Sequence, residues 1–302
     1  MRTAPADGVL SGSGRGPVGV PEPYREAMRA WIDGRLLDAP TGPAVALTDH
    51  GYTVGDGVFE ALKVVGGRVR ALEMHLDRLA AGAQTLGLPE PDRDAVRDGI
   101  AAVLADQDAP MMRLRVTLTG GPSPLGYTRG EGAGTLSVIA TPLAPPAPSA
   151  VVATVPWPRN ERSAVAGVKT TSYAEQVVAM AEARQRGADE AVFANLAGHL
   201  CEGASSNVFY VVDGELRTPS LASGCLPGVT RALVIAWTGA REVDEPIATV
   251  LREASEAFLT STTRDVQHIR RWDGVDLPPG QVTAATAQMW RERENELLDV
   301  AR

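Results

Sequence analysis

The chain has 302 residues, of which 44% are hydrophobic, and a formal net charge of −8, so it can bury a core without disulfide staples. Its two cysteines, Cys201 and Cys225, form no CxxC pair, and free thiols in a chain of this size are typical of the reducing cytoplasm. The acidic balance argues against nucleic-acid binding, and the absence of an apolar leader or of a long apolar run argues against secretion and membrane insertion.

Residues 1–28 are rich in Gly, Pro and Ser and predict a flexible N-terminal extension. The extension contains a GxGxxG match from Gly14 to Gly19, but the match follows no strand and carries a proline, so it does not indicate a dinucleotide-binding loop. Two hairpins are expected next, at Asp33-Gly34 and at Gly66-Gly67, because such pairs favour tight turns. Apolar spacing then predicts helices over residues 73–88 and 92–106 and strands over residues 112–120 and 135–141.

Residues 142–150, PLAPPAPSA, are too rich in proline for a helix and indicate a domain boundary. Beyond it we expect a helix over residues 172–187, with Ser172 as N-cap and Gly187 past its end. Further helices are expected over 229–237 and 283–300, and strands over 151–157, 189–194, 206–214, 215–219 and 256–263. The mixture predicts an α/β chain of the α+β kind, with a small domain over residues 29–145 and a larger one over residues 146–302.

Lysine is nearly absent from this chain, since only Lys63 and Lys169 among its 29 basic residues are lysines. Arginine stays charged and forms no imine, whereas a partly buried lysine amine can lose its proton and attack a carbonyl group. Each lysine is therefore a candidate for chemistry that arginine cannot perform. The alternative is that both positions escaped a compositional bias, and the surrounding motifs have to decide.

A carbonyl cofactor such as pyridoxal phosphate needs a lysine for its aldehyde, an acid for its ring nitrogen and a cradle for its phosphate. Glu202, in LCEGASSNVF, is expected in a turn of small residues between two strands, where a flat ring can approach. Arg78, in HLDRL, offers a cation, and backbone N–H groups at two expected helix starts suit a phosphate. These two starts comprise Gly228, Val229 and Thr230 in one case and Ser261, Thr262 and Thr263 in the other.

Each of these features is commonplace when it is taken singly, but their order along the chain is informative. Six motifs follow one another in this sequence: VGDGVFE, HLDRL, a lysine before a helix ending in AEAR, EGASSNVF, LPGVTR and FLTSTT. In this order the chain closely resembles the fold type IV pyridoxal phosphate enzymes, from about Trp31 to its final helix. That family includes branched-chain aminotransferases, D-amino acid aminotransferases and aminodeoxychorismate lyases.

The resemblance implies that Lys169 is the Schiff-base lysine and proton shuttle, and that Glu202 holds the pyridine nitrogen of pyridoxal 5′-phosphate. It implies a phosphate site made of Arg78, Val229, Thr230 and Thr262. Tyr173 would reach the phenolic oxygen of the cofactor, although its offset from the lysine differs by one residue from that of the branched-chain enzymes. Lys63 stands where relatives often carry arginine and is interpreted as structural or substrate-facing. No metal site is expected.

The substrate pocket has to distinguish the branches of this family, and residues 115–130, RVTLTGGPSPLGYTRG, are the informative stretch. The tyrosine-any-arginine-proline run of branched-chain enzymes is missing here, and the glycine-rich turn followed by GY resembles the lyase. Leu125 stands where the lyase often has arginine, so a substrate carboxylate would need Arg113, Arg115 or Arg129 instead. The resemblance favours an aminodeoxychorismate lyase that releases pyruvate and 4-aminobenzoate, with a class IV aminotransferase as the alternative.

The family's architecture implies a smaller N-terminal domain and a larger C-terminal domain with the cofactor between them. Members dimerise with active sites near the subunit interface, so we expect a cytoplasmic homodimer that acts on a small-molecule substrate, without a nucleic-acid or membrane partner. A protein of another class, a non-catalytic scaffold with the same fold, is disfavoured because the lysine, the glutamate and the phosphate-binding groups are all present.

Overall fold

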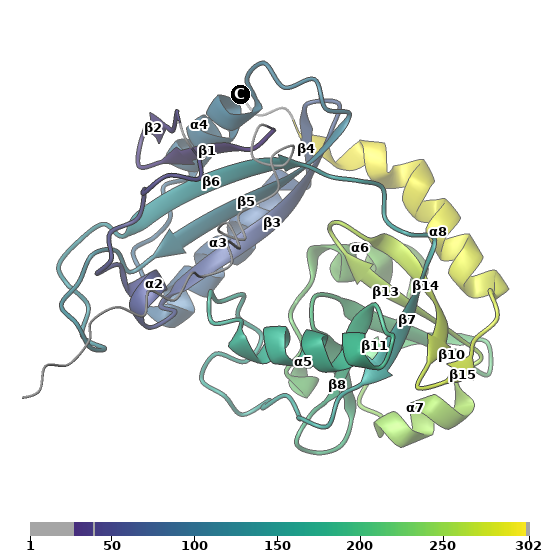
Figure 1. The fold of residues 1–302 in the computed structure, drawn as a ribbon. Helices are drawn as coiled ribbons and strands as arrows, with labels where there is room; N and C mark the ends of the chain where they lie inside the picture. The colour runs from purple at the N-terminus through teal and green to yellow at the C-terminus, as the bar shows by residue number, and fades with distance from the viewer. Residues whose placement is uncertain (1–26, 39, 300–302) are drawn as a thin grey trace, which may run out of the picture.

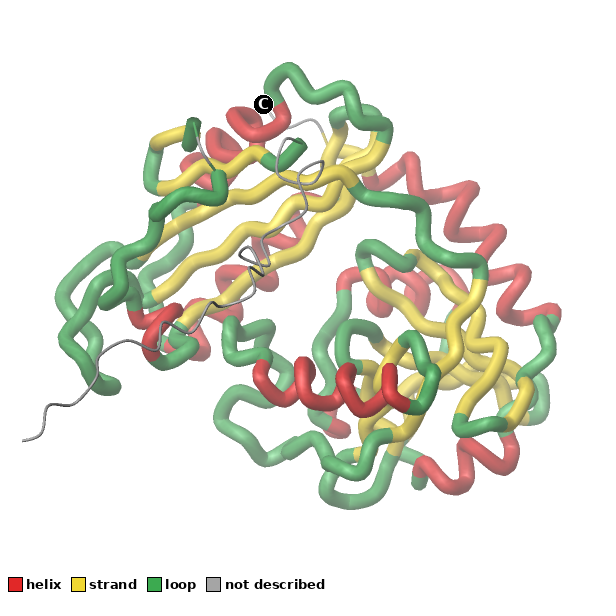
Figure 2. The backbone as a smooth tube through the Cα atoms, in the orientation of Figure 1, coloured by secondary structure: helices red, strands yellow, loops and turns green. Residues whose placement is uncertain are grey.

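Two β-sheets organise the chain, and Figure 2 shows them as two separate groups of strands. The computed structural model describes residues 27–38 and 40–299, so residues 1–26 of the expected extension, with the GxGxxG match, lie outside the described residues. The first sheet has seven strands in the order β16-β4-β3-β5-β6-β1-β2. They are β1 Arg29–Ile32, β2 Arg35–Leu36, β3 Gly57–Val65, β4 Arg68–Arg70, β5 Met111–Thr119, β6 Thr135–Pro142 and β16 Leu298–Asp299.

The two faces of the first sheet have different roles because successive side chains of a strand point to opposite sides. On β3, Val58, Leu62 and Val64 are buried in one apolar cluster with side chains of the helices α3 Leu72–Leu86 and α4 Arg93–Leu104. The side chains of Phe59 and Ala61 point to the opposite face, where they line a cavity. The sheet therefore separates a hydrophobic core from the site.

The chain leaves the first sheet after β6 and reaches the second sheet through residues 143–148, inside the proline-rich stretch. Nine strands form the second sheet, in the order β12-β11-β10-β13-β14-β7-β8-β9 with β15 beside β14. They are β7 Ser149–Thr154, β8 Glu190–Ala194, β9 Leu200–Gly203, β10 Asn207–Val212, β11 Glu215–Pro219, β12 Arg241–Val243, β13 Glu256–Ser261, β14 Asp265–Trp272 and β15 Val275–Asp276.

The second sheet is buried on both faces, as β10 illustrates. Its Val208 and Tyr210 belong to an apolar cluster with α7 Ile247–Glu253, whereas Phe209 and Val211 pack in a cluster with α6 Val229–Thr238 and α8 Gln281–Arg293. A third cluster joins α5 Ala174–Gln185 to β8. Such uninterrupted apolar strands need cover on both sides, which these helices supply.

The two sheets are linked a second time at the C-terminal end. In Figure 1, α8 runs beside the second sheet and back towards the first, where β16 pairs antiparallel with β4. The division into domains at residue 145 stays a prediction.

Several expected elements differ in the structure. The helix predicted over residues 283–300 ends at Arg293, because residues 294–297 form a 3₁₀ turn and β16 follows. Ser172 is not an N-cap, since its hydroxyl donates to the Gly55 carbonyl and Tyr173 occupies the cap position of α5. Six elements were not expected from the sequence: α2 His50–Thr53, α7, β9, β12, β14 and β15.

Two corrections concern candidate site residues. Glu202 lies in β9, paired with Phe193 of β8, and the turn of small residues begins only after Gly203. Thr262 and Thr263 do not begin a helix but lie in the tight turn that joins β13 to β14. Within the described residues, no helix has both the length and the apolar character needed to cross a bilayer.

Candidate active site

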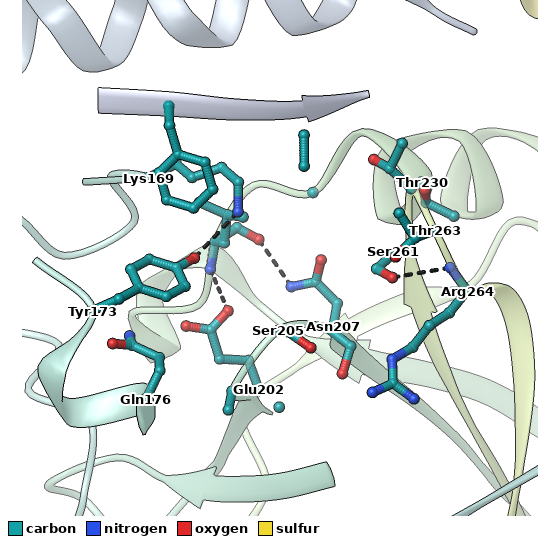
Figure 3. Close-up of a pocket in the computed structure, with 18 of the residues that line it drawn as sticks. Lys169, Tyr173, Gln176, Glu202, Ser205, Asn207, Thr230, Ser261, Thr263 and Arg264 are labelled. Carbon is teal, nitrogen blue, oxygen red and sulfur yellow. Dashed lines mark hydrogen bonds between the residues drawn. The ribbon is translucent and has the colours of Figure 1, made fainter. Parts of the chain in front are cut away.

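A cavity of about 980 Å³ lies between the two sheets, bounded by β3, β5 and β6 on one side and by strand ends and loops of the second sheet on the other. The seven residues that the resemblance proposed for the cofactor all line it. The predicted residues on its wall are Arg78, Lys169, Tyr173, Glu202, Val229, Thr230 and Thr262. Figure 3 shows Lys169 and Tyr173 on one side, Thr230, Ser261 and Thr263 on the other, and Glu202 below.

Lys169 is held in place by backbone pairing with β3. The Phe59 N–H donates to the Lys169 carbonyl at 3.0 Å, and Thr170 forms a bridge with Val58. The Lys169 Nζ donates to the Tyr173 hydroxyl at 3.2 Å and lies 4.4 Å from the centroid of the Phe59 ring. The seam between the sheets therefore fixes the backbone of the lysine and leaves its amine in the cavity.

The environment of Lys169 favours its neutral amine. Burial lowers the pKa of Lys169 to about 8, and the cations of Arg78 and Arg115 add to this effect, although Glu60 and Glu202 oppose it. Near neutral pH a useful fraction of such an amine is unprotonated, which is the form that attacks a carbonyl group. Burial likewise raises the pKa of the neighbouring Tyr173 to about 12, so its hydroxyl stays protonated.

Glu202 presents a carboxylate from the floor of the cavity. Its Oε2 accepts a hydrogen bond from the Leu226 N–H at 2.9 Å, and its Oε1 lies 3.4 Å from Nε of Arg159. Burial raises the pKa of Glu202, while Arg159 and the Leu226 N–H favour the charged form. Arg159, which also pairs with Glu175, was missed by the sequence reading because nothing in its neighbourhood distinguished it from other arginines.

The start of α6 forms a second wall of the site. The Asn207 Nδ2 donates to the Leu226 carbonyl at 2.9 Å, which fixes the loop before Gly228, the N-cap of α6. A Cβ atom at Gly228 would come 2.1 Å from Asn207 Oδ1, so only glycine fits this approach. The backbone N–H groups of the first turn of α6 have no side-chain cap, and an anion is favoured at such a helix end.

Arg78 reaches the cavity from α3 with its guanidinium already oriented. Its Nε and Nη2 donate to the two carboxylate oxygens of Glu60 at 2.7 and 2.6 Å, and its Nη1 donates to the Pro227 carbonyl at 3.0 Å. His75 completes the cluster through Nδ1, 2.7 Å from Glu60 Oε2. Burial alone would raise the pKa of Glu60, but Arg78 and His75 lower it to about 2. Sequence reading did not identify Glu60 or His75.

Two buried hydroxyls on the wall lack partners. The Oγ of Ser206 and the Oγ1 of Thr260 are shielded from solvent and make no hydrogen bond within the described part of the chain. Unpaired buried polar atoms are costly, so a ligand with hydrogen-bonding groups fits this wall. Together with an amine of lowered pKa, a buried carboxylate and an uncapped helix start, the donor set fits pyridoxal 5′-phosphate.

The three arginines considered for a substrate carboxylate differ in placement. Arg115 lines the cavity with its guanidinium 3.6 Å from the Phe59 ring centroid, and burial lowers its pKa. Arg113 also lines the cavity but is exposed. Arg129 is absent from the lining, because its guanidinium binds both oxygens of Asp56 and the carbonyls of residues 86 and 87.

Comparison with known proteins identifies the family that has this architecture. The amino-transferase class IV family model matches residues 57–272. A bifunctional aminodeoxychorismate lyase/D-amino acid transaminase of Mycobacterium tuberculosis is 28% identical over 283 residues, which cover 85% of this chain and 96% of that protein.

Solved structures agree with the family model. The branched-chain aminotransferase from the archaeon Thermoproteus uzoniensis superposes with a TM-score of 0.83 at 27% identity, over 91% of this chain and 99% of that one. A hypothetical aminotransferase from Mycobacterium tuberculosis in its PLP-bound form superposes with a TM-score of 0.76 at 25% identity, over 89% and 99% of the two chains. The chain therefore belongs to the class IV aminotransferase family, with the type IV fold and with pyridoxal 5′-phosphate as its cofactor.

Proposed function

We propose that this enzyme is an aminodeoxychorismate lyase, which eliminates pyruvate from 4-amino-4-deoxychorismate and releases 4-aminobenzoate. The observation that carries the proposal is Arg115, a largely buried cation on the cavity wall. No carboxylate pairs with it among residues 27–38 and 40–299. A buried cation without a carboxylate favours an anionic ligand. Aminodeoxychorismate carries two carboxylates, and Arg115 with the exposed Arg113 offers two cations on one strand face.

In this proposal the residues of the chain divide the work by position. Pyridoxal phosphate, when bound, withdraws electrons from the bonds at the carbon that carries the substrate amine. Lys169 would hold the cofactor through its aldehyde, and its released amine would remove the proton from that carbon. Glu202 would keep the ring nitrogen protonated. The Tyr173 hydroxyl, beside the lysine, would donate a hydrogen bond to the phenolic oxygen of the cofactor. The electron pair left behind would break the C–O bond to the enolpyruvyl group, which would leave as enolpyruvate and take up a proton to become pyruvate. The amine of Lys169 would then bond again to the cofactor aldehyde carbon and release 4-aminobenzoate.

The phosphate of the cofactor would bind to Arg78, to the N–H groups of Val229 and Thr230 at the start of α6, and to the hydroxyl of Thr262. The four residues lie on the cavity wall and come from α3, from the start of α6 and from the turn between β13 and β14. Arg159 is a further candidate site residue beside Glu202, because its guanidinium favours the charged form of that carboxylate.

An aminotransferase is the second candidate, and it is supported by the names of the similar proteins. Two of them are a branched-chain aminotransferase and a bifunctional enzyme that has both lyase and D-amino acid transaminase activity. The first steps of both reactions use the same groups, and the reactions diverge after the proton is removed. In an aminotransferase the proton held by Lys169 would return to the cofactor, whereas in the lyase the remaining electron pair would expel the enolpyruvyl group.

We also propose a cytoplasmic homodimer. Leu125 and Tyr127 are 82% and 93% exposed on one loop, next to the exposed Leu47 and Tyr52, and this apolar surface suits a second copy of the chain. The Ser123 N–H donates to the Thr48 carbonyl, which joins the two segments. Sedimentation equilibrium should return twice the mass of one chain, and a single-chain mass at micromolar concentration would contradict this.

The test uses the purified, cofactor-loaded enzyme with aminodeoxychorismate, and separately with L- and D-amino acids plus 2-oxoglutarate or pyruvate, with products quantified by mass. The proposal predicts 4-aminobenzoate and pyruvate in equal amounts. Transfer of amino groups without 4-aminobenzoate would contradict it and support the second candidate.

The role of Arg115 has its own variant. Arg115→Met should raise the KM for aminodeoxychorismate at least about tenfold, since loss of a buried charge partner costs about 2 kcal/mol or more. Arg291→Met, at an exposed position of α8, is the matched control and should leave KM unchanged. An unchanged KM in Arg115→Met would remove the observation on which the lyase proposal depends.

A further inference from the structure

We infer that Asp265 is a positioning residue for the cofactor phosphate, because its ion pairs with Lys63 and Arg70 hold the β13–β14 turn against the first sheet. The inference rests on the proposed phosphate site in that turn. It assigns a role to Lys63, the one lysine that the proposed mechanism does not use.

The turn is short and its backbone is constrained. Thr262, Thr263 and Arg264 connect β13 to β14, and all three line the cavity. The Arg264 N–H donates to both the carbonyl and the hydroxyl of Ser261 at 3.2 Å. Asp265, the first residue of β14, has a φ of +57°, a left-handed conformation that residues other than glycine adopt at a cost. Surrounding contacts must therefore maintain it.

The contacts that maintain Asp265 come from the other sheet. Its Oδ2 accepts from Lys63 Nζ of β3 at 2.5 Å, and its Oδ1 accepts from Arg70 Nη1 of β4 at 2.6 Å. Both cations are nearly inaccessible to solvent, at 4% and 3% exposure. Glu294 binds the second terminal nitrogen of Arg70, so the cluster has two cations and two carboxylates. A paired cluster of this kind is stable as a unit, but removal of one member leaves a buried charge unpaired.

The opposite side of the turn is fixed by an independent set of contacts. Arg264 donates from Nη2 to Glu190 of β8 and from Nη1 to Gln267 of β14, each at 2.6 Å. The Ser205 hydroxyl and N–H donate to Glu190 at 2.8 and 3.0 Å, which ties the turn to the loop after Glu202. The turn is thus held from both flanks, one flank through the first sheet and one through the second.

The location of Lys63 explains why its ion pair with Asp265 affects the cofactor site. Lys63 is on the same face of β3 as Phe59 and Ala61, which line the cavity, but its ammonium group is occupied by Asp265. Donors that are fixed before a ligand arrives bind it more tightly, because less conformational entropy is lost on binding. The ion pairs of Asp265 with Lys63 and Arg70, which we call the clamp, therefore fix the hydroxyl and N–H groups of the turn before a phosphate binds.

The experiment compares the affinity of the apoenzyme for pyridoxal 5′-phosphate with its affinity for pyridoxal, which lacks the phosphate. Asp265→Asn and Lys63→Met should each raise the Kd of pyridoxal phosphate at least about tenfold, as loss of a partner that orients ligand-binding groups commonly does. The Kd of pyridoxal should stay within about twofold. Lys63→Arg should retain most of the affinity, because it keeps the charge. Asp276→Asn is the matched control, because it removes the β15 partner of an exposed ion pair with Arg271 of β14.

The ³¹P resonance of bound pyridoxal phosphate gives a second readout, which should shift in Asp265→Asn and not in Asp276→Asn. The inference would be overturned if the variants lost equal affinity for pyridoxal and pyridoxal phosphate. It would also be overturned if neither Asp265→Asn nor Lys63→Met lost affinity for pyridoxal phosphate. Thr262→Val separates the two levels of the argument. If it leaves pyridoxal phosphate affinity unchanged, the proposed phosphate site in the turn is wrong, whereas an effect of Thr262→Val without an effect of Asp265→Asn contradicts the positioning role alone.

Discussion

Lys169 and Lys63 differ in what their ammonium groups contact. Lys63 has a carboxylate partner in Asp265, which compensates its burial, whereas the only hydrogen bond of the Lys169 amine among the described residues is to the Tyr173 hydroxyl. A charge that is buried without a close carboxylate becomes easier to neutralise. The same residue type is therefore held as a structural cation at one position and prepared as a nucleophile at the other.

The lowered pKa of Lys169 predicts how the apoenzyme captures its cofactor at different pH values. The free amine forms as pH rises through about 8, so the rate of pyridoxal phosphate attachment should increase from pH 6.5 to 9 with a midpoint near 8. Stopped-flow absorbance of the apoenzyme mixed with the cofactor measures this rate. A midpoint near that of an ordinary lysine, about 10.4, would contradict the account.

At the scale of elements, the contact of β3 with α3 determines how Arg78 is presented. Glu60 comes from the helix-facing side of β3 and binds Arg78 and His75, which are one turn apart on α3. The Pro227 carbonyl, in the loop before α6, accepts a hydrogen bond from Nη1 of the same guanidinium. A strand, a helix and a loop of the other sheet therefore meet at one guanidinium.

Replacement of Glu60 by glutamine tests this joint. Glu60→Gln should lower the free energy of unfolding at pH 7 by roughly 3 kcal/mol, because it removes a fully buried charge and leaves the partly buried Arg78 without a counter-charge. It should also weaken pyridoxal phosphate binding. Chemical denaturation measures the first effect. Glu73→Gln, which removes an exposed carboxylate from α3, is the control and should change the free energy of unfolding by less than about 1 kcal/mol.

The pH dependence of this difference has a definite sign. The pKa of Glu60 is lowered from 4.5 in an ordinary environment to about 2 in the folded protein, so the unfolded chain binds the extra proton first. The stabilisation is fully present above about pH 4.5 and is lost as pH falls towards 2. The stability gap between the wild type and Glu60→Gln should shrink over that interval, and a constant gap would show that the charge of Glu60 is not its source.

The sequence predicted elements with strong local signals and failed where pairing with another strand determines the conformation. Helices α3 and α4 followed from apolar spacing, and the first hairpins followed from Asp33-Gly34 and Gly66-Gly67. Strand β9 was missed because LCEG has little local preference for a strand and is extended only through pairing with β8. The end of α8 was misplaced because β16 forms by pairing with β4, far away in the sequence.

At the scale of the whole molecule, the cavity exists only because two sheets face one another across a seam. The motif order led to seven candidate residues, and all of them line the cavity. Their roles stay predictions. Glu60, Arg159 and Asp265 could not be found from the sequence, since their importance depends on partners that are close in space and not in the chain.

The scarcity of lysine makes the central claim directly measurable. Purified enzyme loaded with pyridoxal phosphate is reduced with borohydride, digested and analysed by peptide mass spectrometry, with Lys169→Ala as the control. We expect the phosphopyridoxyl mass on the peptide that contains Lys169, and we expect it to be absent from the variant. Attachment of the cofactor to Lys63, or to neither lysine of a fully loaded enzyme, would contradict the account.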